Sequence, residues 1–481
     1  MSFIKAYRIP LLFAIISLAL YASFGYDLHR SDFAKLLPLY GALFFLAYKL
    51  IQITKGNFWV LFGFGIAFRL VFLIAIPNLS QDFYRFLWDG RLLLQGVNPY
   101  IFTPEMYAEA TSGLLSLHRL LSGVEVTQAK ELIAGMGALN ASHYSNYPPI
   151  NQLFFAIAAF FAKNSILGSV VVLRLIMILA DVGVFYFGRK LLKNLNLNPH
   201  TIFWYFLNPF IIIELIGNLH FEGVMLFFLV WALYLLQKRK WVWAAVLLGI
   251  SISVKLLPLL FLPLFWQILQ KGYKSTGKVP ERLSHILILN YESILKRMIF
   301  LGVCVLTVVL SFLSFLSSEF LQNFTTTIGL WFQNFEFNAS VYYIIRWIGF
   351  QTVGWNIIAT VGKVLPLLVI VFLLTLTFFR RNETLPKLIT AMLFGVSFYF
   401  LLSTTVHPWY VATPLVLCLF TKYRFPVVWS AVVILSYSAY GADGFKENLW
   451  LVATEYLVVI GYAVWEIRKN TLETNSSLSS T

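Results

Sequence analysis

MIFLGVCVLTVVLSFLSFL, residues Met298 to Leu316, is the stretch that decides the fold class, because it carries no charged side chain from end to end. A helix needs roughly 20 consecutive apolar residues to cross the hydrocarbon layer of a bilayer, and this run is of that length. Similar runs recur along the chain and predict an all-α, polytopic membrane protein. They cover Ile9 to Tyr26, Leu36 to Ile53, Phe58 to Ile76, Leu167 to Phe187 and Ile357 to Phe379.

The composition of the whole chain also indicates a location in lipid. Of the 481 residues, 59% are apolar and only 12% are charged, which is more apolar surface than one water-soluble domain could bury. The two cysteines, Cys304 and Cys418, lie inside apolar runs without the spacing of metal ligands, so neither a disulfide framework nor a zinc site is indicated. Lys5 and Arg8 precede the first apolar run, but no cleavage motif follows it, and we interpret it as a retained helix.

The net charge of +15 would suggest nucleic-acid binding in a soluble protein. Here most basic residues lie in short clusters between apolar runs, which is typical of the cytoplasmic loops of a membrane protein. Nucleic acid is therefore not an expected partner. The clusters begin at Lys5, Lys49, Arg189, Lys238, Lys271, Arg380, Lys422 and Arg468.

Placing these clusters in the cytoplasm predicts the topology of a single membrane domain, 1–481, with about 12 to 14 membrane-spanning helices. Three helices lead from a cytoplasmic N-terminus to residues 79–147, a large extracytoplasmic loop in which helical spacing of apolar residues predicts interfacial helices. The apolar run 148–163 is short for a span, so we expect a re-entrant or interfacial helix. Residues 271–297 form a basic cytoplasmic loop, and the Ser-rich tail 471–481 is expected to be disordered.

Polar residues at the outer ends of the predicted helices are the candidates for function. A charge at bilayer depth costs roughly 2.5 to 3.5 kcal/mol, so a charged residue is seldom found there without a role. Under the topology above, the candidates fall on one side of the membrane. They are Asp82, Arg85, Asp89, Arg91, Tyr147, His220, Glu222, Lys255, Glu336, Asn338, His407 and Tyr410.

Several of these residues also have a structural explanation. Asp82 could be the N-cap of the helix that follows it. Arg85 and Asp89 stand four residues apart, which is the spacing of an intrahelical ion pair. His407 could be an interfacial residue in an aromatic belt. Lys255 is different, because it lies too far from either end of its apolar run to reach water easily, and we expect it to have an anionic partner.

One chemistry would use the whole set of candidates. A carboxylate at the membrane surface can act as a general base toward an acceptor hydroxyl, while Lys, Arg, His and Tyr side chains stabilise the negative charge that builds on a departing phosphate. This is glycosyl transfer from a lipid phosphate whose hydrocarbon tail stays in the bilayer. A soluble nucleotide donor is not indicated, because the sequence has neither a P-loop nor a dinucleotide-binding glycine motif after a strand.

The segment DFYRFLWDGR at 82–91, followed by GVNPY at 96–100 and NYPP at 146–149, resembles the first outer loop of GT-C fold polyprenol-phosphate-sugar glycosyltransferases. It looks most like that of bacterial mannosyltransferases, and it also resembles the loop of the first GPI mannosyltransferase. Shorter matches extend the resemblance over most of the chain as far as Tyr410. They are NLHFEG at 218–223, VKLLP at 254–258, FNAS at 337–340 with Tyr342 and Tyr343, and HPWY at 407–410.

The resemblance implies a GT-C type helical bundle of the inner or plasma membrane, in which residues 1–56 are two additional N-terminal helices. It implies transfer of a sugar, with mannose expected, from a polyprenyl-phosphate donor to a lipid or glycan acceptor at the extracytoplasmic face. Asp82 would be the catalytic base. Gln81 stands where many relatives carry a second acidic or another small polar residue, so we expect no metal cofactor and an inverting transfer.

The alternative function is a transporter or flippase of a lipid-linked or anionic solute, because broken helices with charges at mid-membrane also mark carriers. A carrier should show paired broken helices in related halves, whereas this sequence shows one strong break, at Lys255 and Pro258. We therefore favour the enzyme, with membrane lipids as its further partners. Its expected substrate-binding residues are Arg85, Asp89, Arg91, Tyr147, His220, Glu222, Lys255, Asn338, His407 and Tyr410.

Overall fold

The computed structural model describes residues 2–54, 56–111, 124–270, 291–442 and 444–479. Within these ranges the regular structure is helical, apart from a two-residue pairing of β1 (Tyr440–Gly441) with β2 (Gly444–Phe445). The prediction of an all-α protein is confirmed. Most of the expected basic cytoplasmic loop, residues 271–290, lies outside the described residues.

Seven of the described helices are long and apolar enough to cross a membrane. An eighth span can be formed by η2 (Pro199–Ile202) and α9 (Phe203–Phe206) with η3 (Ile211–Gly217), which meet at a bend of 60°. The protein is therefore an integral, multi-pass membrane protein. The seven long helices are α1 (Ser2–Tyr26), α2 (Phe33–Ile53), α8 (Ile166–Asn194), α13 (Tyr291–Phe312) with η6 (Leu313–Phe315), α16 (Ile358–Phe378), α17 (Leu385–Leu402) and α20 (Leu449–Ser479).

Shorter apolar helices fill the body of the protein between these spans. Each is below the usual length of a membrane span, so the expected total of about 12 to 14 spans stays a prediction. They are α3 (Phe58–Val71), α7 (Pro149–Ala162), α10 (Glu222–Gln237), α11 (Trp241–Val254), η4 (Leu257–Trp266) with η5 (Ile268–Gln270), η7 (Pro408–Val411) with α18 (Ala412–Cys418), and α19 (Phe425–Val432) with η8 (Val433–Ala439).

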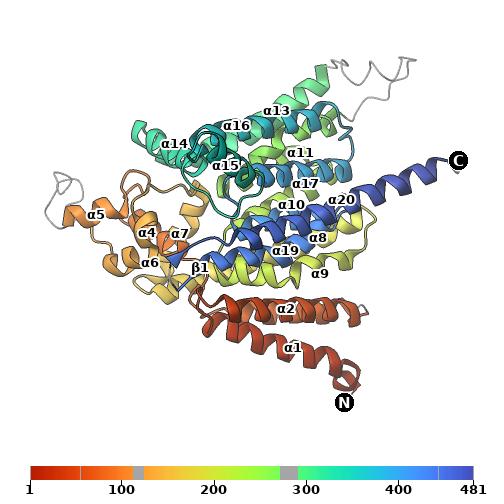
Figure 1. Cartoon of the computed structure of the whole chain (residues 1–481), viewed down its shortest axis with the longest axis horizontal. Coiled ribbons are helices and arrows are strands. Elements are labelled where there is room, and N and C mark those ends of the chain that lie inside the picture. The colour runs from red at the N-terminus through yellow and green to blue at the C-terminus, as the bar shows by residue number, and fades with distance from the viewer. Residues whose placement is uncertain (1, 55, 112–123, 271–290, 443, 480–481) are drawn as a thin grey trace.

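A group of polar or amphipathic helices covers one end of the bundle. It contains α4 (Asp82–Leu94), α5 (Pro104–Thr111) and α6 (Ala129–Ala141), with α14 (Ser318–Gln333) and α15 (Val341–Thr352) toward the same end (Figure 1). Both chain termini lie at the opposite end of the bundle (Figure 1). This arrangement agrees with a topology that puts residues 79–147 and the termini on opposite sides of the membrane, and which side is cytoplasmic stays a prediction.

The last helix, α20, continues to Ser479 and so includes most of the segment 471–481 that we expected to be disordered. The hydroxyl of Thr471 donates to the carbonyl oxygen of Ile467 at 2.8 Å, one helical turn earlier. The polar tail therefore extends the apolar span as a helix, because nothing in the sequence, neither glycine nor proline, interrupts it after Gly461.

The position of α4 is fixed by close packing against α7. A Cβ atom on Gly90 would lie 2.3 Å from the carbonyl oxygen of Phe155, so glycine is required at this contact. One turn earlier, the ring of Phe86 stacks on that of Phe155 with their centroids 4.7 Å apart. We expected α7 to be a re-entrant or interfacial helix, and this packing makes it the support of α4.

Buried arginines join the middle of the bundle. Arg69 of α3 pairs with Asp181 of α8, and both side chains are excluded from solvent. Arg174, two turns before Asp181 on α8, instead donates to the carbonyl oxygens of Ile216 and Gly217, each at 2.9 Å. The C-terminal end of η3 has free carbonyl groups that need such donors. Arg174 thereby holds the start of the turn that leads to His220.

Candidate active site

Asp82 is the first residue of α4, and the preceding residue, Gln81, occupies the N-cap position without capping through its side chain. Instead, the side-chain amide of Gln81 donates to the carbonyl oxygen of Met136 at 2.8 Å. Asp82 therefore lies at the positive end of the α4 dipole, which favours its ionised form. Tyr147, which follows the loop at 142–146, lies close enough to Asp82 for its hydroxyl to lower the pKa of that carboxyl group.

The turn 218–223 brings two further candidates to the same place. Asn218 accepts through Oδ1 from the backbone N–H of Leu79 at 3.0 Å, which ties the turn to the segment before Asp82. Leu219 is fully buried with a φ of +61°, a left-handed conformation that costs about 1 to 2 kcal/mol in a residue with a Cβ atom. This reversal of the chain lets α10 begin at Glu222, so that Asp82 and Glu222 both stand at helix N-termini.

Lys255 enters from a third segment, at the expected break in the apolar run 241–270. Its backbone is extended, with φ −145° and ψ 138°, between α11 and η4. Pro258 cannot donate a backbone hydrogen bond, so the helix does not continue through it. The carbonyl oxygen of Val254 that the break sets free accepts from Asn151 of α7 at 2.7 Å. The same helix that supports α4 thus also holds the backbone next to Lys255.

Lys255 has the anionic partner that its burial requires. Its Nζ lies 3.1 Å from Oε1 of Glu222, whose side chain is 3% exposed, against 24% for that of Lys255. The same Nζ lies 5.6 Å from the centre of the Tyr147 ring. Because the Tyr147 hydroxyl also acts on the Asp82 carboxyl group, Tyr147 links the three segments that carry Asp82, Glu222 and Lys255.

Two histidine rings stack on one tryptophan beside this group. The ring of His220 lies 3.6 Å from the ring of Trp409, and the ring of His407 lies 4.5 Å from it, both nearly parallel to the indole. Tyr410 packs edge-on to His407 at 5.4 Å. Burial lowers the pKa of His220, and it lowers the pKa of His407 to about 3, because the nearby charge of Lys255 adds to the effect. Both rings are therefore neutral and each can donate through one N–H.

The electrostatics of Asp82 are those of a buried carboxylate among mixed charges. Burial raises its pKa above the ordinary value of 3.8, and the negative charge of Glu222 raises it further. The positive charges of Lys255 and Arg30 and the hydrogen bond from Tyr147 lower it. A carboxyl group whose pKa is raised by burial is a better proton acceptor than an exposed one.

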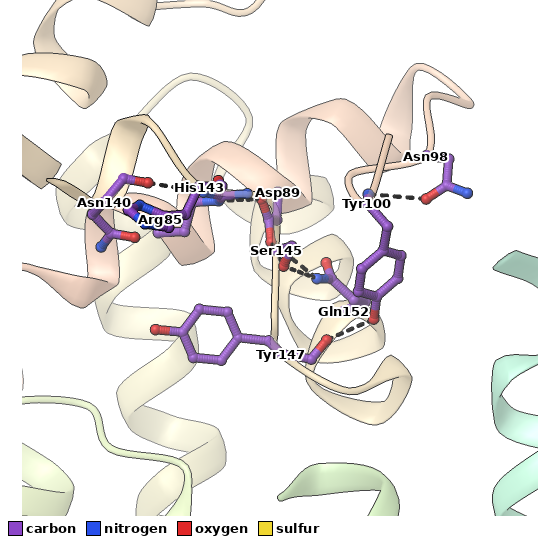
Figure 2. Close-up of polar contacts among 9 residues, drawn as sticks. All are labelled: Arg85, Asp89, Asn98, Tyr100, Asn140, His143, Ser145, Tyr147 and Gln152. Carbon is purple, nitrogen blue, oxygen red and sulfur yellow. Dashed lines mark hydrogen bonds and ion pairs between the residues drawn. The ribbon is translucent and has the colours of Figure 1, made fainter. Parts of the chain in front are cut away.

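Asp89 lies in a separate hydrogen-bonded network (Figure 2). It accepts from Arg85 Nε at 2.8 Å, from Ser145 Oγ at 2.5 Å and from Gln152 Nε2 at 2.9 Å. Arg85 also donates to the carbonyl oxygens of Asn140 and His143. In Figure 2 the ring of Tyr147 points away from this cluster, while its backbone carbonyl accepts from Tyr100. The network therefore shapes the loop that presents Tyr147 to Asp82.

Besides Arg85 and Asp89, two more of the expected site residues lie elsewhere. Arg91 donates to Thr127, Gln128 and Asn164, and so ties α4 to the ends of α6 and α7. Asn338 adopts a φ of +47°, and its side-chain amide donates to both carboxylate oxygens of Glu455 on α20. The structure brings together Asp82, Tyr147, His220, Glu222, Lys255, His407 and Tyr410.

Several members of this neighbourhood were not among the residues expected from the sequence. Glu214 lies in the π-helical turn η3, with Oε2 3.7 Å from Nε2 of His220, and its Oε1 accepts from the Tyr437 hydroxyl at 2.8 Å. Arg30 donates to the carbonyl oxygen of Leu79, three residues before Asp82, and its guanidinium carbon lies 4.0 Å from the centre of the Tyr440 ring. Glu214 could have been noticed as a carboxylate within an apolar run, whereas nothing near Arg30 or Tyr440 in the sequence indicates a site.

The neighbourhood of Asp82 contains several side chains of the types that bind metals. Within the part of the chain that the structure describes, no group of three or more His, Cys, Asp or Glu side chains is placed to hold a metal ion. The polar groups that converge here are a carboxylate at a helix N-terminus, a lysine paired with a second carboxylate, neutral imidazoles and tyrosine hydroxyls. Such a set can accept a proton and stabilise an oxyanion within one small volume.

Comparison with known proteins gives the family. A family model described as mannosyltransferase (PIG-M) matches residues 217–467, which is more than half of the chain and includes Glu222, Lys255 and His407. The chain belongs to the PIG-M mannosyltransferase family. A second model, described as the N-terminal domain of alpha-(1->6)-mannopyranosyltransferase, matches residues 59–271 and includes Asp82. The resemblance to GT-C mannosyltransferases that the sequence motifs indicated is confirmed.

Two individual relatives of this family member share one name. Alpha-(1->6)-mannopyranosyltransferase A of Mycobacterium tuberculosis is 23% identical over 210 residues, covering 43% of this chain and 37% of the relative. Alpha-(1->6)-mannopyranosyltransferase A of Corynebacterium glutamicum is 22% identical over 366 residues, covering 71% of this chain and 66% of the relative. The matches thus span less than two thirds of the length of either relative.

Proposed function

We propose that this mannosyltransferase-family protein transfers mannose from a polyprenyl-phosphate donor to a hydroxyl group of a lipid or glycan acceptor. The reaction takes place at the extracytoplasmic end of the bundle and inverts the configuration at the anomeric carbon. The observation that carries the proposal is the meeting of Asp82 with the Lys255–Glu222 pair at the helix-covered end, where 3.1 Å separates the two charged atoms of the pair. A base and a cation are there combined in one place.

Asp82 acts as the general base. As the acceptor oxygen forms a bond to C1 of the mannosyl group, the Asp82 carboxylate takes up the hydroxyl proton, and the bond from C1 to the phosphate oxygen breaks. The electron pair leaves with the phosphate, so the second product is polyprenyl phosphate. A single displacement of this kind inverts the configuration at C1. An α-linked product, as the names of the two relatives suggest, therefore requires a β-linked phosphate donor.

The departing phosphate gains negative charge during this step, and its stabilisation falls to the donors around Asp82. Lys255 supplies a positive charge, and neutral His220 and Tyr410 can supply N–H and O–H groups. The hydroxyl of Tyr147, which acts on the Asp82 carboxyl group, orients the carboxylate toward the acceptor. Because the phosphate carries a hydrocarbon chain, the apolar helices beside the site are the natural place for that chain.

A transporter or flippase is the alternative, and the family membership does not favour it. The discriminating experiment incubates membranes that contain the protein with radiolabelled polyprenyl-phosphate mannose and candidate glycolipid acceptors, followed by analysis of the products. A new mannosylated glycolipid that fails to form with Asp82→Asn supports the transferase. Movement of the labelled donor across the bilayer without a new product would decide for the carrier.

A further inference from the structure

The loop between α1 and α2 reaches the candidate active site through Arg30. Its Nη1 donates to the carbonyl oxygen of Leu79 at 3.2 Å, and its guanidinium carbon lies 4.0 Å from the centre of the Tyr440 ring. Leu79 stands three residues before Asp82, and its N–H donates to Asn218. Leu79 therefore joins Arg30 to the turn that carries His220 and Glu222.

The loop that carries Arg30 is held in place by further hydrogen bonds. Asn78 donates through Nδ2 to the carbonyl oxygens of Phe24 at 2.7 Å and Leu28 at 2.9 Å. The hydroxyl of Tyr26 donates to the carbonyl oxygen of Val71 at 2.7 Å. These bonds fasten the outer end of the α1–α2 hairpin to the segment between α3 and α4, so the position of Arg30 relative to Asp82 is fixed by the fold.

This hairpin is not part of either family match, since these cover residues 59–271 and 217–467. It lies along one edge of the bundle, packed against the rest of the chain (Figure 1). The hydroxyl of Tyr40 on α2 donates to the carbonyl oxygen of Ser430 on α19 at 2.6 Å, so the hairpin is also tied to the C-terminal part. The charge near Asp82 thus comes partly from a segment that the family models do not describe.

The charge balance of the site gives Arg30 a role. The charged side chains that act on Asp82 are Lys255, Glu222 and Arg30. Glu222 offsets the charge of Lys255 through their contact at 3.1 Å, and Arg30 offsets that of Asp82. Without Arg30 this group would carry a net negative charge, which repels an incoming phosphate anion. A guanidinium has five N–H donors in a planar fork that matches phosphate oxygens. The hydrogen bond from Arg30 to Leu79 uses one of these five donors.

We propose that Arg30 binds the phosphate group of the lipid-linked donor, which makes the N-terminal hairpin part of the substrate site. The identity of the donor rests on the proposed function. Arg30 takes part in no covalent step. Its charge balances the donor phosphate in the ground state and the additional negative charge on the phosphate as the bond to C1 breaks.

The experiment measures ligand binding to purified full-length protein, so that it does not depend on turnover. Three ligands are compared. Farnesyl phosphate has both a prenyl chain and a phosphate group. Farnesol lacks the phosphate, and inorganic phosphate lacks the chain. The variants are Arg30→Gln and Arg30→Lys. The matched control is Lys35→Gln. This change removes another cation of the same hairpin, the lysine that pairs with Asp27 near the surface.

We expect Arg30→Gln to bind farnesyl phosphate at least about 10-fold more weakly, as is usual for loss of a charge-assisted hydrogen bond. Farnesol should bind equally to wild type and Arg30→Gln, which also shows that the variant is folded. Arg30→Lys should restore part of the affinity, and Lys35→Gln should match wild type.

Equal affinity of Arg30→Gln and wild type for farnesyl phosphate would overturn the inference, and so would a wild type that does not bind this ligand. Binding of inorganic phosphate as tight as that of farnesyl phosphate would assign Arg30 to a free-phosphate site and would also overturn it. Failure of the proposed function is distinguishable, because it would appear as Arg30-dependent binding of farnesyl phosphate without any transfer of labelled mannose.

Discussion

Nζ of Lys255 lies 3.1 Å from Oε1 of Glu222, and this pair joins a break in the apolar run 241–270 to the first residue of α10. The pair is asymmetric, because Glu222 is almost fully buried while Lys255 keeps part of its surface exposed. Lysine can therefore contact an incoming anion without leaving its carboxylate partner. A buried carboxylate without a partner would be costly, so the pair has a structural role as well as a proposed role in binding.

Substitution of Asp82 and of Asp89 should separate the chemical role from the structural one. Asp82→Asn keeps the size of the side chain but cannot accept the hydroxyl proton, so turnover should fall roughly 10²- to 10⁴-fold with donor binding retained. Asp89→Asn should instead reduce folded yield, because it leaves the buried Arg85 without its charge partner. Radiolabelled transfer and size-exclusion profiles measure the two effects. Normal turnover by Asp82→Asn would assign the base to another residue.

Substitution of Lys255 should weaken donor binding. Lys255→Met keeps most of the side-chain length without the charge, and loss of a charge-assisted hydrogen bond of about 1.5 to 3 kcal/mol corresponds to roughly 10- to 100-fold weaker binding. Because this change leaves Glu222 unpaired, the double variant Lys255→Met with Glu222→Gln serves as the control for folding. Titration with a prenyl phosphate gives the affinities. An unchanged affinity in both variants would remove Lys255 from the donor site.

The pH dependence of transfer should report on the raised pKa of Asp82. The base works when it is deprotonated, so kcat/KM falls as the pH drops through this pKa, and the fall should come above the ordinary value of 3.8. Lys255→Met removes a charge that lowers the pKa, so the acidic limb should move to higher pH. Glu222→Gln removes a charge that raises the pKa, so the limb should move to lower pH. Shifts of the opposite sign would show that another group controls the profile.

Substitution of Gly90 tests the packing that positions α4. Gly90→Ala places a Cβ atom against the carbonyl oxygen of Phe155, and because this atom belongs to the backbone of α7 the two helices must move apart. We expect a loss of roughly 1 to 3 kcal/mol, the usual cost of overpacking, seen as a lower Tm in detergent. Gly63→Ala is the matched control, since no atom lies within 4 Å of its added Cβ. A Tm for Gly90→Ala equal to that of the control would contradict this packing.

The orientation in the membrane can be tested with introduced cysteines. Ser142→Cys lies just after α6, and Thr471→Cys lies near the end of α20, at the opposite end of the bundle; both positions are exposed. The native cysteines, Cys304 and Cys418, are buried and give little background. With residues 79–147 outside, an impermeant thiol reagent should label Ser142→Cys in intact cells and Thr471→Cys only after permeabilisation. The reverse pattern would invert the topology.

Much of the site could be predicted from the sequence because its residues are charged or polar in apolar surroundings. Lys255 stands out in an apolar run, and the structure supplies the anionic partner that its burial demands. Asp82 was recognised from its position after an apolar run and from the family motif. Arg91 and Asn338 were chosen on the same grounds, yet their contacts are with other parts of the protein. The sequence pattern cannot tell whether a buried polar group faces a substrate or its own chain.

The sequence by itself determined the all-α membrane architecture, the break at Lys255 and the spacing that pairs Arg85 with Asp89, because all three depend on local hydrophobicity, proline and helical periodicity. Only the tertiary structure decided which of the distant segments meet. Arg30 and Tyr440 are 410 positions apart, yet the Arg30 guanidinium lies over the Tyr440 ring and donates to Leu79, three residues before Asp82. Such contacts arise from the packing of whole helices, in which each residue contributes little, so no short stretch of sequence encodes them.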